Sequence, residues 1–161
     1  MDMPQFQYAG FWKRFVAYII DQIIVGIASL VLLVPFFALI GVSAFTMHDE
    51  DLSYDSEAAI SVVIALIAAY ITLIAAIWIC QWLYYALMES SSYQGTLGKM
   101  ALGIKVTDMN GNGISFGRAT GRYFAKIISS LTLCIGYIIA GFTQQKQALH
   151  DIIASCLVVN K

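Results

Sequence analysis

Two long apolar segments constrain this chain more than any other feature of its sequence. The first runs from Phe15 to about Val42 and the second from Ala58 to about Met88. Each is longer than the roughly 20 residues with which an α-helix crosses the hydrocarbon core of a bilayer. The 161-residue chain is 60% hydrophobic and only 12% charged, about half the charged fraction of an ordinary soluble domain. We therefore predict a single all-α integral membrane domain with two long transmembrane helices, over residues 15–42 and 58–88.

Residues 115–143 predict a membrane element of another kind. Arg118, Arg122 and Lys126 recur at every fourth residue and would form one basic stripe on a helix. Such a stripe is typical of an amphipathic helix that contacts lipid headgroups. The uncharged run that follows, Ile127 to Phe142, is short and has Gly136 near its middle. We expect a third short span or a re-entrant hairpin here.

Between these membrane segments, residues 89–114 are rich in Gly, Ser and Asn. The sequence NGNG separates two β-like stretches, GIKVTD at 103–108 and ISF at 114–116. This pattern predicts a β-hairpin, which would form a small cytoplasmic cap. In the tail, residues 144–161, the sequence LVV at 157–159 resembles a terminal strand that would pair beside IKV at 104–106.

The acidic and basic residues are distributed unevenly along the chain. Five of the ten acids fall between Asp49 and Glu57, and no Lys or Arg occurs between residues 15 and 98. Basic residues precede the first apolar segment and follow the second. By the positive-inside rule, the N-terminus and the 89–114 loop lie in the cytoplasm, and the acidic loop at 43–57 is extracytoplasmic.

One acid, Asp21, interrupts the first apolar segment. If the hydrocarbon begins near Phe15, Asp21 lies roughly 9 Å deep, where an ionised carboxylate normally faces protein or water. Arg14 lies two turns earlier on nearly the same helix face, but helical side chains lean towards the N-terminus, away from Asp21. Asp21 therefore needs a water cavity, a proton or another partner. Candidate partners are Arg118, Arg122, His150 and the same residues of a neighbouring subunit.

Each charged position also has a purely structural interpretation. Asp21 would then be a protonated or hydrogen-bonded packing residue that sets the helix register. Arg14 would be an anchoring residue that reaches the lipid phosphates. Asp151, in the sequence ALHD, would be an exposed acid near a helix end. His150 beside it would titrate near neutral pH, but adjacent helical residues do not face each other, so no His–Asp relay follows.

Several function classes find no support in the sequence. Cys80, Cys134 and Cys156 lie in apolar surroundings without a CxxC pair, as expected of small packing residues. The stretch GTLGKM at 95–100 lacks the spacing of a phosphate-binding loop. We predict a protein that is not an enzyme, with no cofactor, no metal site and no nucleic-acid partner.

The order and spacing of these motifs resemble the RDD family of small bacterial integral membrane proteins. The family is named for an arginine at the start of its first transmembrane helix, an aspartate within that helix and a second aspartate near the C-terminus. These positions match Arg14, Asp21 and the Asp151 of QALHD. Between them, YQGTLGKMALGIKVTDMNGNGISFGRATGR is similar to the family's central segment.

This resemblance implies a multi-pass protein of the bacterial cytoplasmic membrane and raises the expectation of transport. Sodium or proton antiport has been proposed for some members, which implies cation or proton binding at Asp21 and Asp151 with Arg14 as an electrostatic partner. Two or three spans cannot readily enclose a pathway, so transport would require a homo-oligomer or a membrane-protein partner. The alternative is a non-catalytic scaffold or accessory subunit whose buried charges support helix packing and partner binding.

Overall fold

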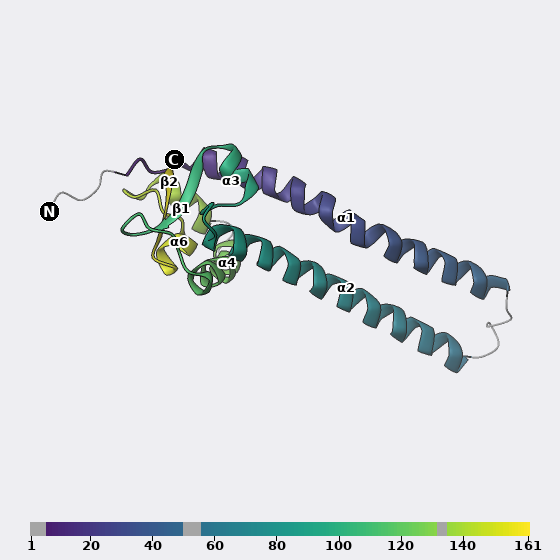
Figure 1. Ribbon diagram of the computed structural model, residues 1–161. Helices are drawn as coiled ribbons and strands as arrows, with labels where there is room; N and C mark the ends of the chain where they lie inside the picture. The colour runs from purple at the N-terminus through teal and green to yellow at the C-terminus, as the bar shows by residue number, and fades with distance from the viewer. Residues whose placement is uncertain (1–5, 50–55, 132–134) are drawn as a thin grey trace. The chain divides into compact units, whose positions relative to one another are not determined.

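The computed structural model describes residues 6–49, 56–131 and 135–161 (Figure 1). Helices dominate, and they are interrupted by two short strands. In chain order the elements are α1 (Phe11–Asp49), α2 (Ser56–Ser90), α3 (Leu97–Ala101), β1 (Ile104–Asp108), α4 (Phe116–Leu131), α5 (Ile135–Ile138), the 3-10 helix η2 (Ile139–Gly141), α6 (Leu149–Ile153) and β2 (Cys156–Asn160).

Helices α1 and α2 contain the two predicted membrane segments. The stretches Phe11–Val42 and Ile60–Ser90 are long and apolar enough to cross a membrane, which confirms the prediction of two such helices. With 39 residues, α1 extends about 58 Å, well beyond the ~30 Å of a hydrocarbon core. It begins before the predicted start at residue 15 and continues through residues 43–49 of the predicted acidic loop. Residues 50–55 of that loop lie outside the described residues.

The chain forms two compact units. One unit, called the head here, consists of Met1–Ile23 with Gln81–Lys161, and the other consists of Ile24–Cys80. The second unit holds the remaining parts of α1 and α2, where many large apolar side chains are exposed. Every residue of the charge clusters described below belongs to the head.

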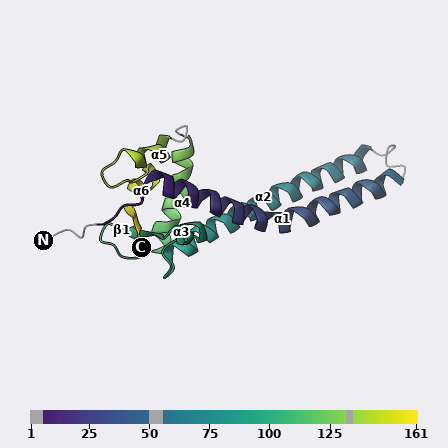
Figure 2. The ribbon, with the colours of Figure 1, turned by 90° about the horizontal axis from the view of Figure 1, so that it is seen from above.

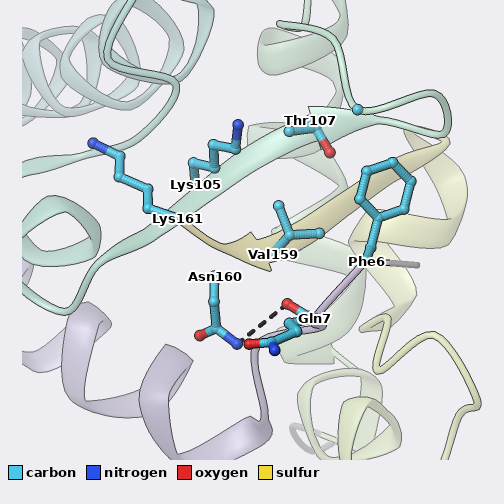
Figure 3. Close-up of a pocket in the computed structure, with 8 residues that line it drawn as sticks. Phe6, Gln7, Lys105, Thr107, Val159, Asn160 and Lys161 are labelled. Carbon is cyan, nitrogen blue, oxygen red and sulfur yellow. Dashed lines mark hydrogen bonds between the residues drawn. The ribbon is translucent and has the colours of Figure 1, made fainter. Parts of the chain in front are cut away.

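A small antiparallel sheet lies within the head. Strand β1 pairs with β2 in a register that places Val106 opposite Val158, so the terminal strand pairs beside IKV as predicted. The N-terminal segment extends the pairing, since the backbone N–H of Asn160 donates to the Gln7 carbonyl oxygen over 2.8 Å. The side-chain Nδ2 of Asn160 donates to the same oxygen (Figure 3). Ile104, Val106 and Val158 are fully buried and form part of the core.

The predicted hairpin between 103–108 and 114–116 is wrong. Residues Gly113–Ser115 form no strand, and Phe116 begins α4. The Asp108 carboxylate accepts backbone N–H groups from Asn110 over 2.9 Å and from Asn112 over 2.8 Å. These bonds close a local turn after β1. The strand that pairs with β1 is β2, which comes from the end of the chain.

In helix α4 the buried face carries polar residues and the exposed face is apolar, which is the reverse of a surface helix in a soluble protein. Its buried face consists of Ala119, Arg122, Ala125 and Ser129, whereas Phe124, Ile127, Ile128 and Leu131 are exposed. An apolar outer face of this kind is suited to lipid rather than to water. The helical stretch Ile135–Gly141 makes an angle of 117° with α4, and Figure 2 shows α4 and α5 together in the head. The third span or re-entrant hairpin remains a prediction.

Candidate functional site

The first turns of α1 present a polar face to the head. Ala17 and Asp21 are buried and Arg14 is partly buried, whereas Trp12 and Tyr18 are exposed. Spacings of three and four residues place Arg14, Ala17 and Asp21 on one side of the helix. The opposite side of the helix exposes large apolar groups. The start of α1 therefore packs in the head through the side that carries Arg14 and Asp21.

Asp21 is held by hydroxyl and backbone donors. Its Oδ1 accepts hydrogen bonds from the Tyr84 hydroxyl over 2.9 Å and from the Gly98 amide N over 2.8 Å. Its Oδ2 accepts the Thr96 hydroxyl over 2.5 Å. No ion pair to Asp21 occurs in the part of the chain that the structure describes. The predicted partners Arg118, Arg122 and His150 are therefore wrong for the single chain, and α2 and α3 supply the donors instead.

Gly98 allows α1 and α3 to approach closely at this point. A Cβ atom on Gly98 would lie 2.2 Å from the Ala17 carbonyl oxygen and 3.0 Å from Asp21 Cγ. The first of these distances is far below van der Waals contact. The position thus requires glycine so that its N–H can reach the Asp21 carboxylate.

A second cluster is a chain of five alternating charges, called the charge chain here. Arg14 Nη1 contacts Asp151 Oδ2. Arg122 joins the two acids, with Nη2 2.7 Å from Asp151 Oδ1 and Nη1 2.7 Å from Glu89 Oε2. Glu89 Oε1 in turn contacts Lys99 Nζ. In order, the residues come from α1, α6, α4, α2 and α3, so the charge chain joins five helices.

Asp151 is completely buried, so the purely structural interpretation of it as an exposed acid is wrong. Its Oδ2 also accepts the Ala148 backbone N–H over 3.1 Å, at the start of α6. Burial by itself would raise the pKa of Asp151, but the positive charges of Arg122 and Arg14 hold this pKa well below its usual range. Asp151 is therefore ionised at neutral pH.

His150 is buried beside Asp151. Its Nδ1 lies 3.3 Å from the Ser129 hydroxyl and its Nε2 lies 3.5 Å from Asp151 Oδ1. Burial lowers the pKa of His150 to about 3, although the charge of Asp151 acts in the opposite direction. The prediction that His150 titrates near neutral pH is wrong, because the protein interior favours the neutral ring.

The predicted basic stripe of α4 divides between two environments. Arg122 is buried in the charge chain and Lys126 lies with its Nζ 4.0 Å from the centroid of the Tyr85 ring. Arg118 is exposed, and only its backbone N–H forms a described hydrogen bond, to Ser115 Oγ. Arg118 therefore does not belong to the charge chain.

Two of the cavities in the described part of the head concern the site. One, of about 390 Å³, is lined by Asp21, by Arg14, Lys99 and Arg122 of the charge chain and by Lys126, together with aromatic and aliphatic side chains. The other, of about 410 Å³, lies beside the sheet and is lined by Lys105, Thr107, Val159 and Lys161 among others (Figure 3). The first cavity contains predicted site residues and the second contains none.

Sequence reasoning gave no site role to Glu89, Lys99 or the three donors to Asp21. Glu89 carried a usable signal, since it is the sole acid between Glu57 and Asp108 and ends an apolar segment. Thr96, Gly98 and Lys99 lie inside the segment that resembles the RDD family. Their roles depend on tertiary contacts with α1 and α2.

This arrangement defines the class: a small helical membrane protein with two long apolar helices and a head that buries clustered charged residues. Comparison with known sequences makes the assignment specific. The RDD family profile matches residues 8–155, and the chain belongs to the RDD family.

Two relatives come from Bacillus subtilis strain 168. Uncharacterized protein YxaI is 40% identical over 153 residues, which cover 95% of this chain and 97% of the relative. Uncharacterized membrane protein YteJ is 29% identical over 160 residues, which cover 96% of this chain and 82% of the relative. No solved structure matches the chain. The three residues that name the family occupy two sites here, with Arg14 and Asp151 paired in the charge chain and Asp21 held separately.

Proposed function

We propose that this protein is a non-catalytic membrane scaffold or accessory subunit. Helices α1 and α2 would anchor the head in the membrane, and the head would bind a membrane-protein partner or a second copy of the chain. One observation carries this proposal: each of the three buried acids, Asp21, Glu89 and Asp151, is satisfied by donors from other helices. Buried charges arranged in this way connect helices.

The donors around Asp21 favour a structural role over cation binding. Two hydroxyl groups and one backbone N–H direct hydrogen atoms at its carboxylate. These donors occupy three of the roughly four lone-pair sites of the carboxylate, so a sodium ion would find too few free oxygen sites here for full coordination. Removing one member of a buried charged pair costs about 3–5 kcal/mol, so the charge chain makes alternative packings of the head unfavourable.

The proposal includes a membrane orientation. The N-terminus and the 89–114 segment would lie on the cytoplasmic side of the bacterial cytoplasmic membrane, and residues 43–57 would be extracytoplasmic. The sheet would form the cytoplasmic cap. The apolar face of α4 would contact lipid, and Ile135–Gly141 would complete a broken span or a re-entrant element. This arrangement is supported by the charge distribution and by the exposed apolar residues of α4.

The alternative proposal is transport of a monovalent cation or proton by a homo-oligomer. It is favoured by the presence of Asp21 and Arg14 in the wall of one cavity. Protonation of a carboxylate would then alternate with cation binding. This proposal ranks second because Arg14 already pairs with Asp151 and Asp21 already accepts three hydrogen bonds.

The variant Asp21→Asn separates the two proposals. Under the scaffold proposal it lowers the free energy of unfolding by about 1–3 kcal/mol, because the amide NH₂ group would face hydrogen-bond donors. It should also reduce the yield of cross-linked complexes in native membranes. Purified wild-type protein in proteoliposomes should give no sodium-driven pH change above that of protein-free vesicles. Asp108→Asn is the matched control, because Asp108 lies in a surface turn.

The opposite set of results would reject the scaffold as the main role. Wild-type proteoliposomes would show a sodium-driven pH change, Asp21→Asn would abolish it, and the unfolding transition and the cross-linked complexes would be unchanged. Asp108→Asn would retain the flux in that case.

A further inference from the structure

The charges that line the 390 Å³ cavity and its two clusters do not balance. Four cations, Arg14, Lys99, Arg122 and Lys126, face three acids, Asp21, Glu89 and Asp151. Lys126 forms no ion pair with an acid of the described residues, and its ammonium group lies against the Tyr85 and Tyr123 rings. Ammonium groups in a protein interior are normally paired with an anion. The ammonium group of Lys126 is therefore available to an anionic acceptor in the cavity.

Arg14 carries a second unused donor next to the same cavity. Its Nε donates to the Ala9 carbonyl oxygen over 3.0 Å and its Nη1 contacts Asp151. Its Nη2 is buried and has no hydrogen-bond partner within the described part of the chain. A buried donor on a charged group is costly to leave unsatisfied, and Arg14 lines the cavity together with Lys126. Both features call for an anionic acceptor.

Another part of the cavity wall is apolar and reaches the outer surface of the head. Phe15, Tyr18 and Ile138 line the cavity and are also among the exposed apolar residues. Next to them, Trp12 is 73% exposed and packs edge-on against Phe15. Exposed aromatic residues beside basic ones are typical of the depth at which a membrane protein meets lipid headgroups.

We propose that this cavity binds the phosphate group of an anionic phospholipid, with Lys126 Nζ and the guanidinium group of Arg14 as donors. A phosphodiester carries one negative charge, and its oxygens are good acceptors for guanidinium and ammonium groups. The acyl chains would leave along Phe15, Tyr18 and Ile138, where the cavity wall is also the surface that faces lipid. This lipid site is independent of whether the head acts as a scaffold or in transport.

Lipid binding by the purified full-length protein tests this proposal. Native mass spectrometry would measure retention of phosphatidylglycerol and of phosphatidylcholine with the same acyl chains. We expect one phosphatidylglycerol per chain, bound about tenfold more tightly than phosphatidylcholine, and we expect Lys126→Gln to weaken it by about tenfold. Lys126→Arg should retain binding. Arg118→Gln is the matched control, since it removes an exposed cation from the same helix and should change the affinity less than about twofold.

Lys126→Gln should remain folded, because Lys126 takes part in no described ion pair. An unchanged unfolding temperature in lipid-free detergent checks this.

Equal binding of the two lipids overturns the proposal. So does a loss with Arg118→Gln as large as that with Lys126→Gln, which would indicate general surface attraction. A third titration uses inorganic phosphate. If inorganic phosphate binds in a way that depends on Lys126 and phosphatidylglycerol does not bind, the lipid assignment is wrong.

Discussion

At the scale of single residues, the two family aspartates are stabilised by different chemistry. Asp151 meets two guanidinium groups, whereas Asp21 meets two hydroxyls and a backbone N–H. Cationic partners hold Asp151 ionised. The donors of Asp21 are uncharged, so its hydrogen bonds depend on how closely α2 and α3 approach α1. Gly98 is the position where that shape is most restrictive.

Gly98→Ala should destabilise the head by about 1–3 kcal/mol, the usual cost of overpacking. The added methyl group would meet the Ala17 carbonyl oxygen and would move the Gly98 N–H away from Asp21. Chemical unfolding in detergent measures the change. Gly121→Ala is the control, because a Cβ on Gly121 would meet no atom within 4 Å and alanine favours the helix. If the two variants are equally stable, the close approach of α1 and α3 is not as described.

At the scale of elements, the charge chain explains how very short helices persist. Helices α3 and α6 each have five residues, too few to be stable alone. Lys99 fixes α3 to Glu89 of α2, and Asp151 fixes α6 to α1 and α4. His150 adds a further contact between α6 and α4 through Ser129. These short elements thus depend on buried polar contacts.

Because His150 is buried neutral, the stability of the head should decrease in mild acid. The unfolded chain binds a proton at His150 below about pH 6.5, but the folded chain does not until about pH 3, the value to which burial lowers its pKa. Stability is thus complete above pH 6.5 and falls as the pH drops towards 3, by about 2 kcal/mol between pH 6.5 and 5. Asp151, whose pKa is lowered, loses its contribution only below about pH 4.

Unfolding midpoints at pH 7.5, 6.5, 5.5 and 5 would check this dependence. His150→Gln should remove most of the slope between pH 6.5 and 5, because glutamine does not titrate. His48→Gln alters the chain's other histidine and should keep the slope. A slope that survives His150→Gln and disappears in His48→Gln would contradict the role given to His150.

The sequence predicted the long elements better than the short ones. Apolar length alone indicates α1 and α2, because crossing a bilayer requires a long continuous helix. The strand at Ile104–Asp108 was expected with two possible neighbours: the pairing with the terminal strand is confirmed, whereas the local hairpin with 114–116 is wrong. Arg14, Arg122 and Asp151 of the charge chain were expected as site residues, but Glu89, Lys99 and the order in which the five charges pair were not. Arg14 and Asp151 are 137 residues apart, and helical periodicity gives no information on such contacts.

At the scale of the whole molecule, the sign of the charge changes along the chain. The segment between the two membrane helices is acidic, whereas the basic residues near the start of α1 and after α2 belong to the head. Lys99 and Arg122 are held in buried ion pairs, but Lys13 and Lys161 are exposed. Exposed basic residues are available to the cytoplasmic leaflet, which carries negative lipids. The orientation proposed above therefore depends on few residues and is open to a direct test.

Labelling of single cysteines should report that orientation. In a chain whose native cysteines are replaced by alanine, Glu57→Cys and Asn112→Cys would each introduce one thiol at an exposed position. A membrane-impermeant maleimide should label Glu57→Cys in intact spheroplasts and Asn112→Cys only after permeabilisation, because residue 57 is the last residue of the acidic loop and residue 112 belongs to the head. The cysteine-free chain gives the background. Labelling of Asn112→Cys, but not of Glu57→Cys, in intact spheroplasts would show the reverse orientation. The exposed lysines of the head would then face the outer leaflet, and the positive-inside argument would fail for this chain.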